Sequence, residues 1–178
     1  MKILILYDRT AIDDNGNNWL LPLLEKFSSA DNVESIMLNH NELKYCTGCF
    51  GCWIKTPGMC VIKNDSANEI SKKYMNADKV ILLTRVTYGG YSADTKAFLD
   101  RSIVNLSPFF IKKNGEMHHK KRYKKYPDLI LCGYGSITDS ERKTFLKLSE
   151  RNALNLHPEK NVTILLDDEN ETIKNIKF

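Results

Sequence analysis

The chain has 178 residues, of which 42% are hydrophobic and 27% charged, and its formal net charge at pH 7 is +4. This length is typical of one domain and the hydrophobic content suffices for a core, so we expect a single domain over residues 1–178. No apolar stretch approaches the roughly 18 residues that a membrane helix needs, and residues 1–7 lack the pattern of a secretory leader. We therefore expect a soluble, cytoplasmic protein that does not bind membranes.

The first part of the chain predicts two strands with a helix between them. Residues 3–7 form a short apolar run, which indicates a buried strand. Asn18 is a suitable cap for the helix, and Pro22 must then lie near its first turn, where a missing N–H group is tolerated. Residues 33–38 are less apolar and predict an edge strand.

The middle of the chain predicts a loop, two helices and a strand. The loop, residues 44–64, contains four cysteines. Ser66 and Glu69 have the spacing of a capping box, which predicts that a helix begins there. Residues 80–83 form the next apolar run and predict a third strand, and Ser92 is placed to cap the helix that follows it.

The last part of the chain begins with a second insertion, residues 106–127, for which we predict no regular element. Residues 129–132 and 162–166 are apolar and predict the fourth and fifth strands. Thr138 and Glu141 repeat the capping-box spacing and predict the helix between these strands.

This alternation of strands and helices predicts right-handed crossovers and a mostly parallel sheet that is covered on both faces. Five strands are the number in the doubly wound, flavodoxin-like α/β fold, whose strand order is 2-1-3-4-5 and whose ligands bind at the carboxyl ends of the strands. Residues 169–178 are short for a helix that would cover the last strand. A partner subunit could cover that face, so we expect a homo-oligomer.

Three loops at the ends of strands carry the residues that a phosphorylated, flat cofactor would need. The loop of residues 8–18 leads into a predicted helix, and the free N–H groups at a helix start favour an anion. An ordinary polar loop is the alternative interpretation. In the loop after the third strand, Gly89 and Gly90 stand beside Tyr88, and such glycines allow close backbone approach to a ring. Residues 133–135 form a third glycine-containing loop. Together the loops predict a cofactor pocket.

Two blocks of the sequence resemble a known family. Residues 84–93 (TRVTYGGYSA) and 96–101 (KAFLDR), together with residues 46–52 (CTGCFGC), are similar to blocks of the NAD(P)H-dependent FMN reductase and iron-sulfur flavoprotein group. The resemblance extends from residue 1 to about residue 155. It implies a flavodoxin-like fold, FMN as cofactor and NAD(P)H as electron donor.

The resemblance also implies which residues contact FMN. The first loop holds the phosphate, the second wraps the isoalloxazine ring, and the third flanks it. The residues carried over are Arg9, Thr10, Asn17, Asn18, Thr84, Arg85, Val86, Thr87, Tyr88, Gly89, Gly133, Tyr134 and Gly135. Asp8, Arg85 and Thr87 stand where the family usually has other residues.

Four cysteines lie within fifteen residues and are candidate metal ligands; they are Cys46, Cys49, Cys52 and Cys60. Crowded cysteines in a cytosolic chain indicate metal or redox chemistry more than structural disulfides. Four thiolates can ligate a [4Fe-4S] cluster, and the compact motif resembles that of iron-sulfur flavoproteins. A zinc site is chemically feasible, although structural zinc sites more often split their ligands into two pairs. Four reduced thiols that only shape a pocket are the remaining alternative.

The insertion before the fourth strand is basic, since seven lysines and arginines but one acid lie between residues 112 and 126. A solvated surface segment is the simplest interpretation. The alternative is that these cations attract the phosphates of NAD(P)H or an anionic substrate. Few aromatic residues accompany them, so we do not expect nucleic acid as a partner.

The leading hypothesis is an FMN-dependent oxidoreductase that passes electrons from NAD(P)H to a small acceptor, such as a quinone, a nitro compound or a flavin. Because the cofactor carries the chemistry, we assign no acid-base residue. The alternative is a non-enzymatic electron carrier with FMN, alone or with an iron-sulfur cluster. A signalling receiver domain shares the strand order, but it needs an aspartate at the end of the third strand, where this chain has Thr84 and Arg85.

Overall fold

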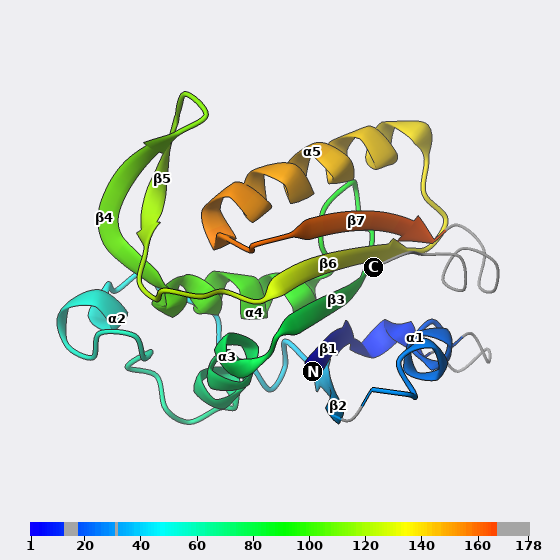
Figure 1. Ribbon diagram of the computed structural model, residues 1–178, viewed down its shortest axis with the longest axis horizontal. Coiled ribbons are helices and arrows are strands. Elements are labelled where there is room, and N and C mark those ends of the chain that lie inside the picture. The colour runs from blue at the N-terminus through cyan, green and yellow to red at the C-terminus, as the bar shows by residue number, and fades with distance from the viewer. Residues whose placement is uncertain (13–17, 31, 167–178) are drawn as a thin grey trace.

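A parallel sheet of five strands forms the centre of the computed structural model, which describes residues 1–12, 18–30 and 32–166 (Figure 1). The strand order is β2-β1-β3-β6-β7, which confirms the predicted flavodoxin-like topology because β6 and β7 are the fourth and fifth strands of this sheet. The strands are β1 (Lys2–Asp8), β2 (Asn32–Leu38), β3 (Lys79–Arg85), β6 (Asp128–Tyr134) and β7 (Asn161–Leu166).

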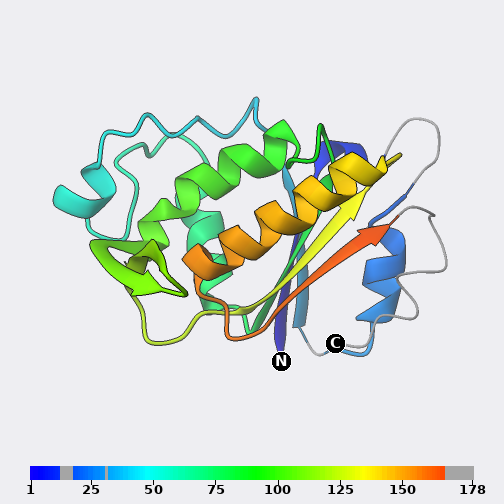
Figure 2. The same ribbon diagram turned by 90° about the horizontal axis from the view of Figure 1, so that it is seen from above.

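Helices cover both faces of this sheet (Figure 2). The helices α3 (Ala67–Asn76), α4 (Ala93–Arg101) and α5 (Asp139–Leu156) lie on one face, and α1 (Leu21–Lys26) lies on the other. Shorter helical turns are η1 (Arg9–Ala11), α2 (Gly51–Ile54) and η2 (Ser102–Asn105). Among the described residues, no helix is long and apolar enough to cross a membrane.

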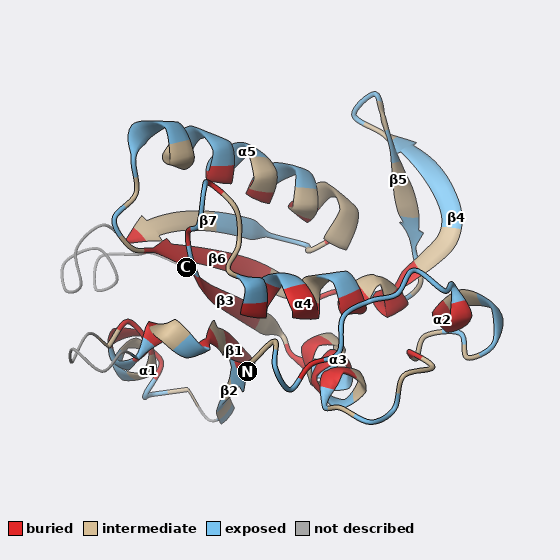
Figure 3. Cartoon of the chain, turned by 180° about the vertical axis from the view of Figure 1, so that it is seen from behind, coloured by how far each residue is buried: buried red, intermediate tan, exposed pale blue. Residues whose placement is uncertain are grey.

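The two cores follow from the alternation of side chains along each strand. In β1, Ile3 and Ile5 pack with α1, whereas Leu4 and Leu6 pack with α3 and α4. A central parallel strand is therefore apolar at consecutive positions, which is why the short apolar runs identified these strands. Figure 3 shows the buried residues in the strands and on the inward sides of the helices.

The starts of α4 and α5 agree with the sequence patterns, whereas those of α1 and α3 do not: the N-cap position of α1 is Leu20 and not the predicted Asn18. Thr138 and Glu141 form the predicted capping box, and the Ser92 side chain accepts the Thr95 N–H group. Ser66 makes no side-chain cap bond, because its backbone is helical (φ −80°, ψ −4°) and caps need extended backbone. The neighbouring Asp65 carboxylate instead accepts the Ala67 N–H group at 3.2 Å.

The basic insertion forms a hairpin that the sequence analysis did not predict. Strands β4 (Leu106–Lys113) and β5 (Glu116–Lys121) pair antiparallel as a separate two-stranded sheet. Asn114 and Gly115 turn the chain with φ of 51° and 83°, which is the conformation that an Asn-Gly pair adopts readily. Figure 1 shows the hairpin on the side of the molecule away from the carboxyl ends of β6 and β7.

Candidate functional site

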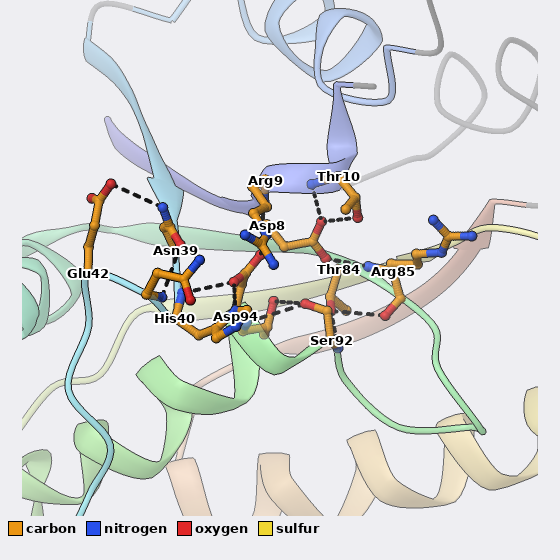
Figure 4. Close-up of polar contacts among 12 residues, drawn as sticks. Asp8, Arg9, Thr10, Asn39, His40, Glu42, Thr84, Arg85, Ser92 and Asp94 are labelled. Atoms are coloured by element: carbon orange, nitrogen blue, oxygen red, sulfur yellow. Dashed lines mark hydrogen bonds and ion pairs between the residues drawn. The ribbon is translucent and has the colours of Figure 1, made fainter. Parts of the chain in front are cut away.

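The carboxyl ends of β1, β3 and β6 meet around the buried side chain of Asp8 (Figure 4). Its carboxylate accepts the Thr10 N–H group at 3.1 Å, the Thr10 hydroxyl at 2.8 Å and the Arg85 N–H group at 2.6 Å. The Tyr134 hydroxyl donates to the same carboxylate. One buried carboxylate thus joins the three strand ends where the sequence predicts the cofactor loops.

The hydroxyl of Tyr134 stays protonated in this network. Burial and the neighbouring Asp8 carboxylate raise the pKa of Tyr134 well above its ordinary value. Its ring also stacks on Trp19, with ring centroids 5.2 Å apart. Tyr134 therefore acts as a hydrogen-bond donor that holds Asp8, and its hydroxyl faces the interior of the site.

A second buried carboxylate, Asp94, joins two loops to the start of α4 (Figure 4). It accepts the Arg9 N–H group at 3.3 Å and forms an ion pair with the Arg9 side chain, with Nε and Oδ2 3.4 Å apart. It also accepts the His40 N–H group at 2.8 Å and contacts His40 Nδ1 at 2.5 Å. Asp94 and His40 were missed by sequence reasoning; the only signal was an acid in the first turn of a predicted helix.

The second predicted loop ends in a tight turn that presents an aromatic side chain. Thr87 and Gly90 exchange backbone hydrogen bonds of 3.0 and 2.9 Å around Tyr88 and Gly89, whose φ values are 51° and 73°. A Cβ atom at Gly89 would lie 2.7 Å from the Thr144 Cβ on α5, so the turn needs glycine there. Tyr88 is 93% exposed and is therefore free to stack on a ring.

The third predicted loop begins inside β6. A Cβ atom at Gly133 would lie 2.8 Å from the side chains of Leu165 and Val86, so this glycine allows packing beneath the site. Val86 donates its N–H group to the Tyr134 carbonyl at 2.9 Å, which ties the second loop to the third. Gly135 follows the strand with φ of 118°.

The structure therefore brings most of the predicted flavin residues to one edge of the sheet. Two residues of the first loop are exceptions: the Asn18 side chain accepts the Leu21 N–H group at 2.9 Å just before α1, whose N-cap position is Leu20, and Asn17 lies outside the described residues. The tail that motivated the expectation of a homo-oligomer, residues 169–178, also lies outside them.

The four cysteines line one cavity of about 320 Å³ beside η2. Cys46 and Cys49 are exposed, whereas Cys52 and Cys60 are buried. Gly48 and Phe50 both have left-handed backbone, with φ of 64° and 57°, and this conformation turns the chain on either side of Cys49. The loop thereby brings all four cysteines to the lining of the same cavity.

The sulfur atoms of this cavity influence one another. Burial and the neighbouring Cys60, Cys46 and Cys49 raise the pKa of Cys52, so the thiols are close enough to repel as thiolates. A backbone N–H group of Gly51 lowers the pKa of Cys49. Among the described residues, no three histidine, cysteine or acidic side chains converge closely enough for a single metal ion.

The basic hairpin packs beside the cysteine loop. Trp53 donates its indole N–H group to the Leu106 carbonyl at 3.1 Å, and its ring lies 5.5 Å from that of Phe50 and 4.9 Å from that of His119. The hairpin thus supports the cysteine loop at a distance from the ends of β1, β3 and β6.

Parts of the chain are similar to archaeal iron-sulfur flavoproteins. The chain is 35% identical to an iron-sulfur flavoprotein of Archaeoglobus fulgidus over 81 residues, which are 46% of this chain and 36% of that protein. It is 45% identical to one of Methanocaldococcus jannaschii over 70 residues, which are 39% of this chain and 35% of that protein. The matches thus span little more than a third of these relatives.

Solved structures with the same fold include an azoreductase and a quinone oxidoreductase. An FMN-dependent NADH-azoreductase from Bacillus anthracis, solved with FMN, superposes with a TM-score of 0.66 at 14% identity over 98% of this chain and 93% of that chain. An NAD(P)H:quinone oxidoreductase from Methanothermobacter marburgensis gives a TM-score of 0.63 at 13% identity over 93% and 84%. At this level of identity the likeness establishes the fold alone.

The family model of the NADPH-dependent FMN reductases matches residues 1–123, which include β1, the cysteine loop and the second predicted flavin loop. That match covers more than half of the chain and agrees with the strand order. The chain therefore belongs to the NADPH-dependent FMN reductase family.

Proposed function

We propose that this protein binds FMN at the carboxyl ends of β1, β3 and β6 and uses it to pass electrons from NAD(P)H to a small acceptor. The observation that carries the proposal is the joining of three predicted flavin loops around Asp8 in a chain of the FMN reductase family. The acceptor class is a quinone, a nitro compound or a flavin, in keeping with the quinone reductase among the structural neighbours.

The residues at this edge fit FMN, with one amendment to the predicted contacts. Arg9 in the first loop supplies positive charge for the phosphate, and the exposed Tyr88 in the second loop supplies a face for the ring. However, the N–H groups of Thr10 and Arg85 already donate to Asp8. Contacts from these two residues to FMN must therefore use their other atoms.

The protein's own contribution to the reaction is to bind FMN, to orient it and to shield it from solvent. When bound, FMN supplies the hydride and electron chemistry. Asp8 holds the loops in one arrangement, because it lies at the end of β1 and accepts hydrogen bonds from η1, β3 and β6 at once. Asp94 fixes the start of α4 against the first loop. We assign no acid-base residue.

We further propose that Cys46, Cys49, Cys52 and Cys60 hold a [4Fe-4S] cluster. Three observations support it: the sulfurs line one cavity, the spacing is compact, and the archaeal relatives are named iron-sulfur flavoproteins. The thiolates of such a cluster bind four different irons, so they need not converge on one point as the ligands of a zinc ion do. The donor set therefore fits a cluster better than zinc.

Helix α4 connects the two proposed sites. Ser92 and Asp94 at its start belong to the edge with Asp8, whereas Arg101 at its end lines the cysteine cavity. Its nine residues span about 13 Å at 1.5 Å per residue. A cluster in the cavity would be placed to relay single electrons to or from the flavin.

Anaerobically purified protein tests these proposals. We expect NAD(P)H oxidation that depends on both FMN and an added acceptor, and iron and acid-labile sulfide in cluster amounts. No acceptor-dependent oxidation across a panel of quinones, nitro compounds and flavins would contradict the enzyme. One-electron exchange without NAD(P)H oxidation would favour the carrier, and absence of iron after reconstitution would remove the cluster.

The proposed oligomer is tested separately. We expect the protein to elute from size exclusion, with light scattering, at a mass above that of one 20.5 kDa chain. A monomer at micromolar concentration would contradict a homo-oligomer.

A further inference from the structure

One buried ion pair closes the cysteine loop at its base. The side chains of Arg101 and Asp65 are 1% and 0% exposed. They form a two-pronged contact, with Nη1 to Oδ2 at 2.7 Å and Nη2 to Oδ1 at 3.2 Å. Burial opposes ionisation of Asp65, but hydrogen bonds from Arg101 and the Lys44 N–H group outweigh it and lower the pKa of this carboxyl. Both partners are therefore charged at neutral pH.

The same pair binds the chain on both sides of the four cysteines. Arg101 Nη1 donates to the Lys44 carbonyl at 2.7 Å, and Nη2 donates to the Ile62 carbonyl at 3.3 Å. The Asp65 carboxylate accepts the Lys44 N–H group at 2.9 Å. Residues 44 and 62 enclose all four cysteines, so the guanidinium fixes where the loop leaves the body and where it returns.

The positive end of this ion pair borders the cysteine cavity. Arg101 lines the cavity together with the four cysteines, and it is the one cation among the described residues of that lining, whereas Asp65 lies outside the lining. An anionic occupant of the cavity would therefore be attracted by the guanidinium more than it is repelled by Asp65.

We propose that Arg101 is the positioning residue of the cysteine cavity: its two terminal nitrogens close the loop, and its guanidinium places positive charge beside the cysteines or the anion they hold. This role goes beyond FMN reduction. Its first two tests need no metal, and only the third rests on the proposed cluster.

The variants must avoid leaving one buried charge alone, since that would unfold the protein without testing the idea. Arg101→Lys keeps the charge but loses the fork. The double variant Asp65→Asn with Arg101→Gln removes both charges and keeps polar groups. Lys147→Gln is the control, because Lys147 is exposed on α5 and lies outside the cavity lining.

Hydrogen exchange of the metal-free protein tests the closure. Arg101→Lys and the double variant should speed exchange in α2 (Gly51–Ile54) and at Cys60 about tenfold, while β3 and β6 keep their protection. Lys147→Gln should leave exchange in both regions unchanged. Unchanged protection of the loop in both test variants would overturn the closing role.

Alkylation at fixed pH tests the charge. The alkylation rates of Cys52 and Cys60 are measured with anionic iodoacetate and with neutral iodoacetamide, and the first rate is divided by the second. Both reagents attack the same thiolate, so differences in thiolate fraction and most differences in access drop out of this ratio. The ratio should fall in the double variant, by less than the roughly threefold effect of one unit charge about 6 Å away in water-like surroundings, because Asp65 loses its charge as well but lies outside the cavity lining. It should stay at the wild-type value in Arg101→Lys and Lys147→Gln, and an unchanged ratio in the double variant would overturn the electrostatic role.

After reconstitution, a cluster gives a third readout that a purely structural role would not move. The double variant should have a lower midpoint potential than the wild type at equal iron content, whereas Arg101→Lys should keep the wild-type value. An equal potential in all variants would contradict the charge effect. If the wild type takes up no iron, the proposed cluster fails, and the exchange and alkylation results still decide the role of Arg101.

Discussion

Substitution of Asp8 by asparagine tests the network that joins the three loops. Asparagine has the same shape, but one carboxylate oxygen becomes an NH₂ group. In the wild type, Oδ1 accepts from Thr10 and Tyr134, whereas Oδ2 accepts the Arg85 N–H group at 2.6 Å. Whichever way the amide is turned, at least one buried donor then faces another donor.

The expected loss of stability follows from the number of buried donors that lose their acceptor. One unsatisfied buried donor costs about 1–3 kcal/mol, so Asp8→Asn should lower the free energy of unfolding by about that amount. Asp8→Ala leaves the N–H groups of Thr10 and Arg85 and the Tyr134 hydroxyl without this acceptor, and should cost about 3–5 kcal/mol.

Urea unfolding followed by circular dichroism measures both values. Asp100→Asn is the control, because Asp100 is exposed and its pair with Lys96 should be worth less than about 0.5 kcal/mol. If Asp8→Asn were no more destabilising than Asp100→Asn, the carboxylate would not be what holds the strand ends together.

Three further predictions concern glycines, caps and pH. Gly89→Ala should destabilise more than Gly115→Ala: both have positive φ, costing about 1–2 kcal/mol, but a Cβ at Gly89 also meets Thr144 at 2.7 Å, whereas one at Gly115 meets nothing within 4 Å. Equal losses in urea unfolding would contradict this packing. Thr138→Ala should lower stability by about 1 kcal/mol and Ser66→Ala hardly at all, since only Thr138 makes a cap bond; the reverse order would contradict these helix starts. Because the folded-state pKa of Asp65 is depressed, its contribution to stability is present above the unfolded pKa of roughly 4 and is lost as pH falls through the lower folded value. The double variant Asp65→Asn with Arg101→Gln, which leaves no buried charge alone, should therefore flatten the acid side of the stability profile, and an unchanged slope between about pH 5 and pH 2 would count against this ionisation.

The sheet could be predicted from the sequence because each central strand is buried on both faces and must be apolar at consecutive positions. The helix starts were predictable where a side chain makes its bond locally, as at Thr138. Ser66 has the same pattern, but Asp65 beside it is fixed by Arg101, 36 residues away, and caps the helix first. The spacing of Ser66 and Glu69 gives no sign that Asp65 takes the place of Ser66 as the acceptor at this helix start.

The site was predictable to the level of its loops and no further. From the sequence, Asp8 was only a residue that stands where the family usually has another, whereas in the structure its carboxylate accepts hydrogen bonds from donors 77 and 126 residues away. Asp94 and Arg101 were visible only as members of a helix. The hairpin had a local signal in Asn114 and Gly115, but the density of lysines favoured a solvated loop.

The central claim is that FMN binds at the edge formed by β1, β3 and β6. Titration of the metal-free protein with FMN, followed by quenching of flavin fluorescence, tests it most directly. We expect saturation at one FMN per chain, and the same titration of Asp8→Ala should show weaker binding because the three loops separate. Absence of saturable binding by the folded wild-type protein would contradict the claim, whatever the fate of the cysteine cavity.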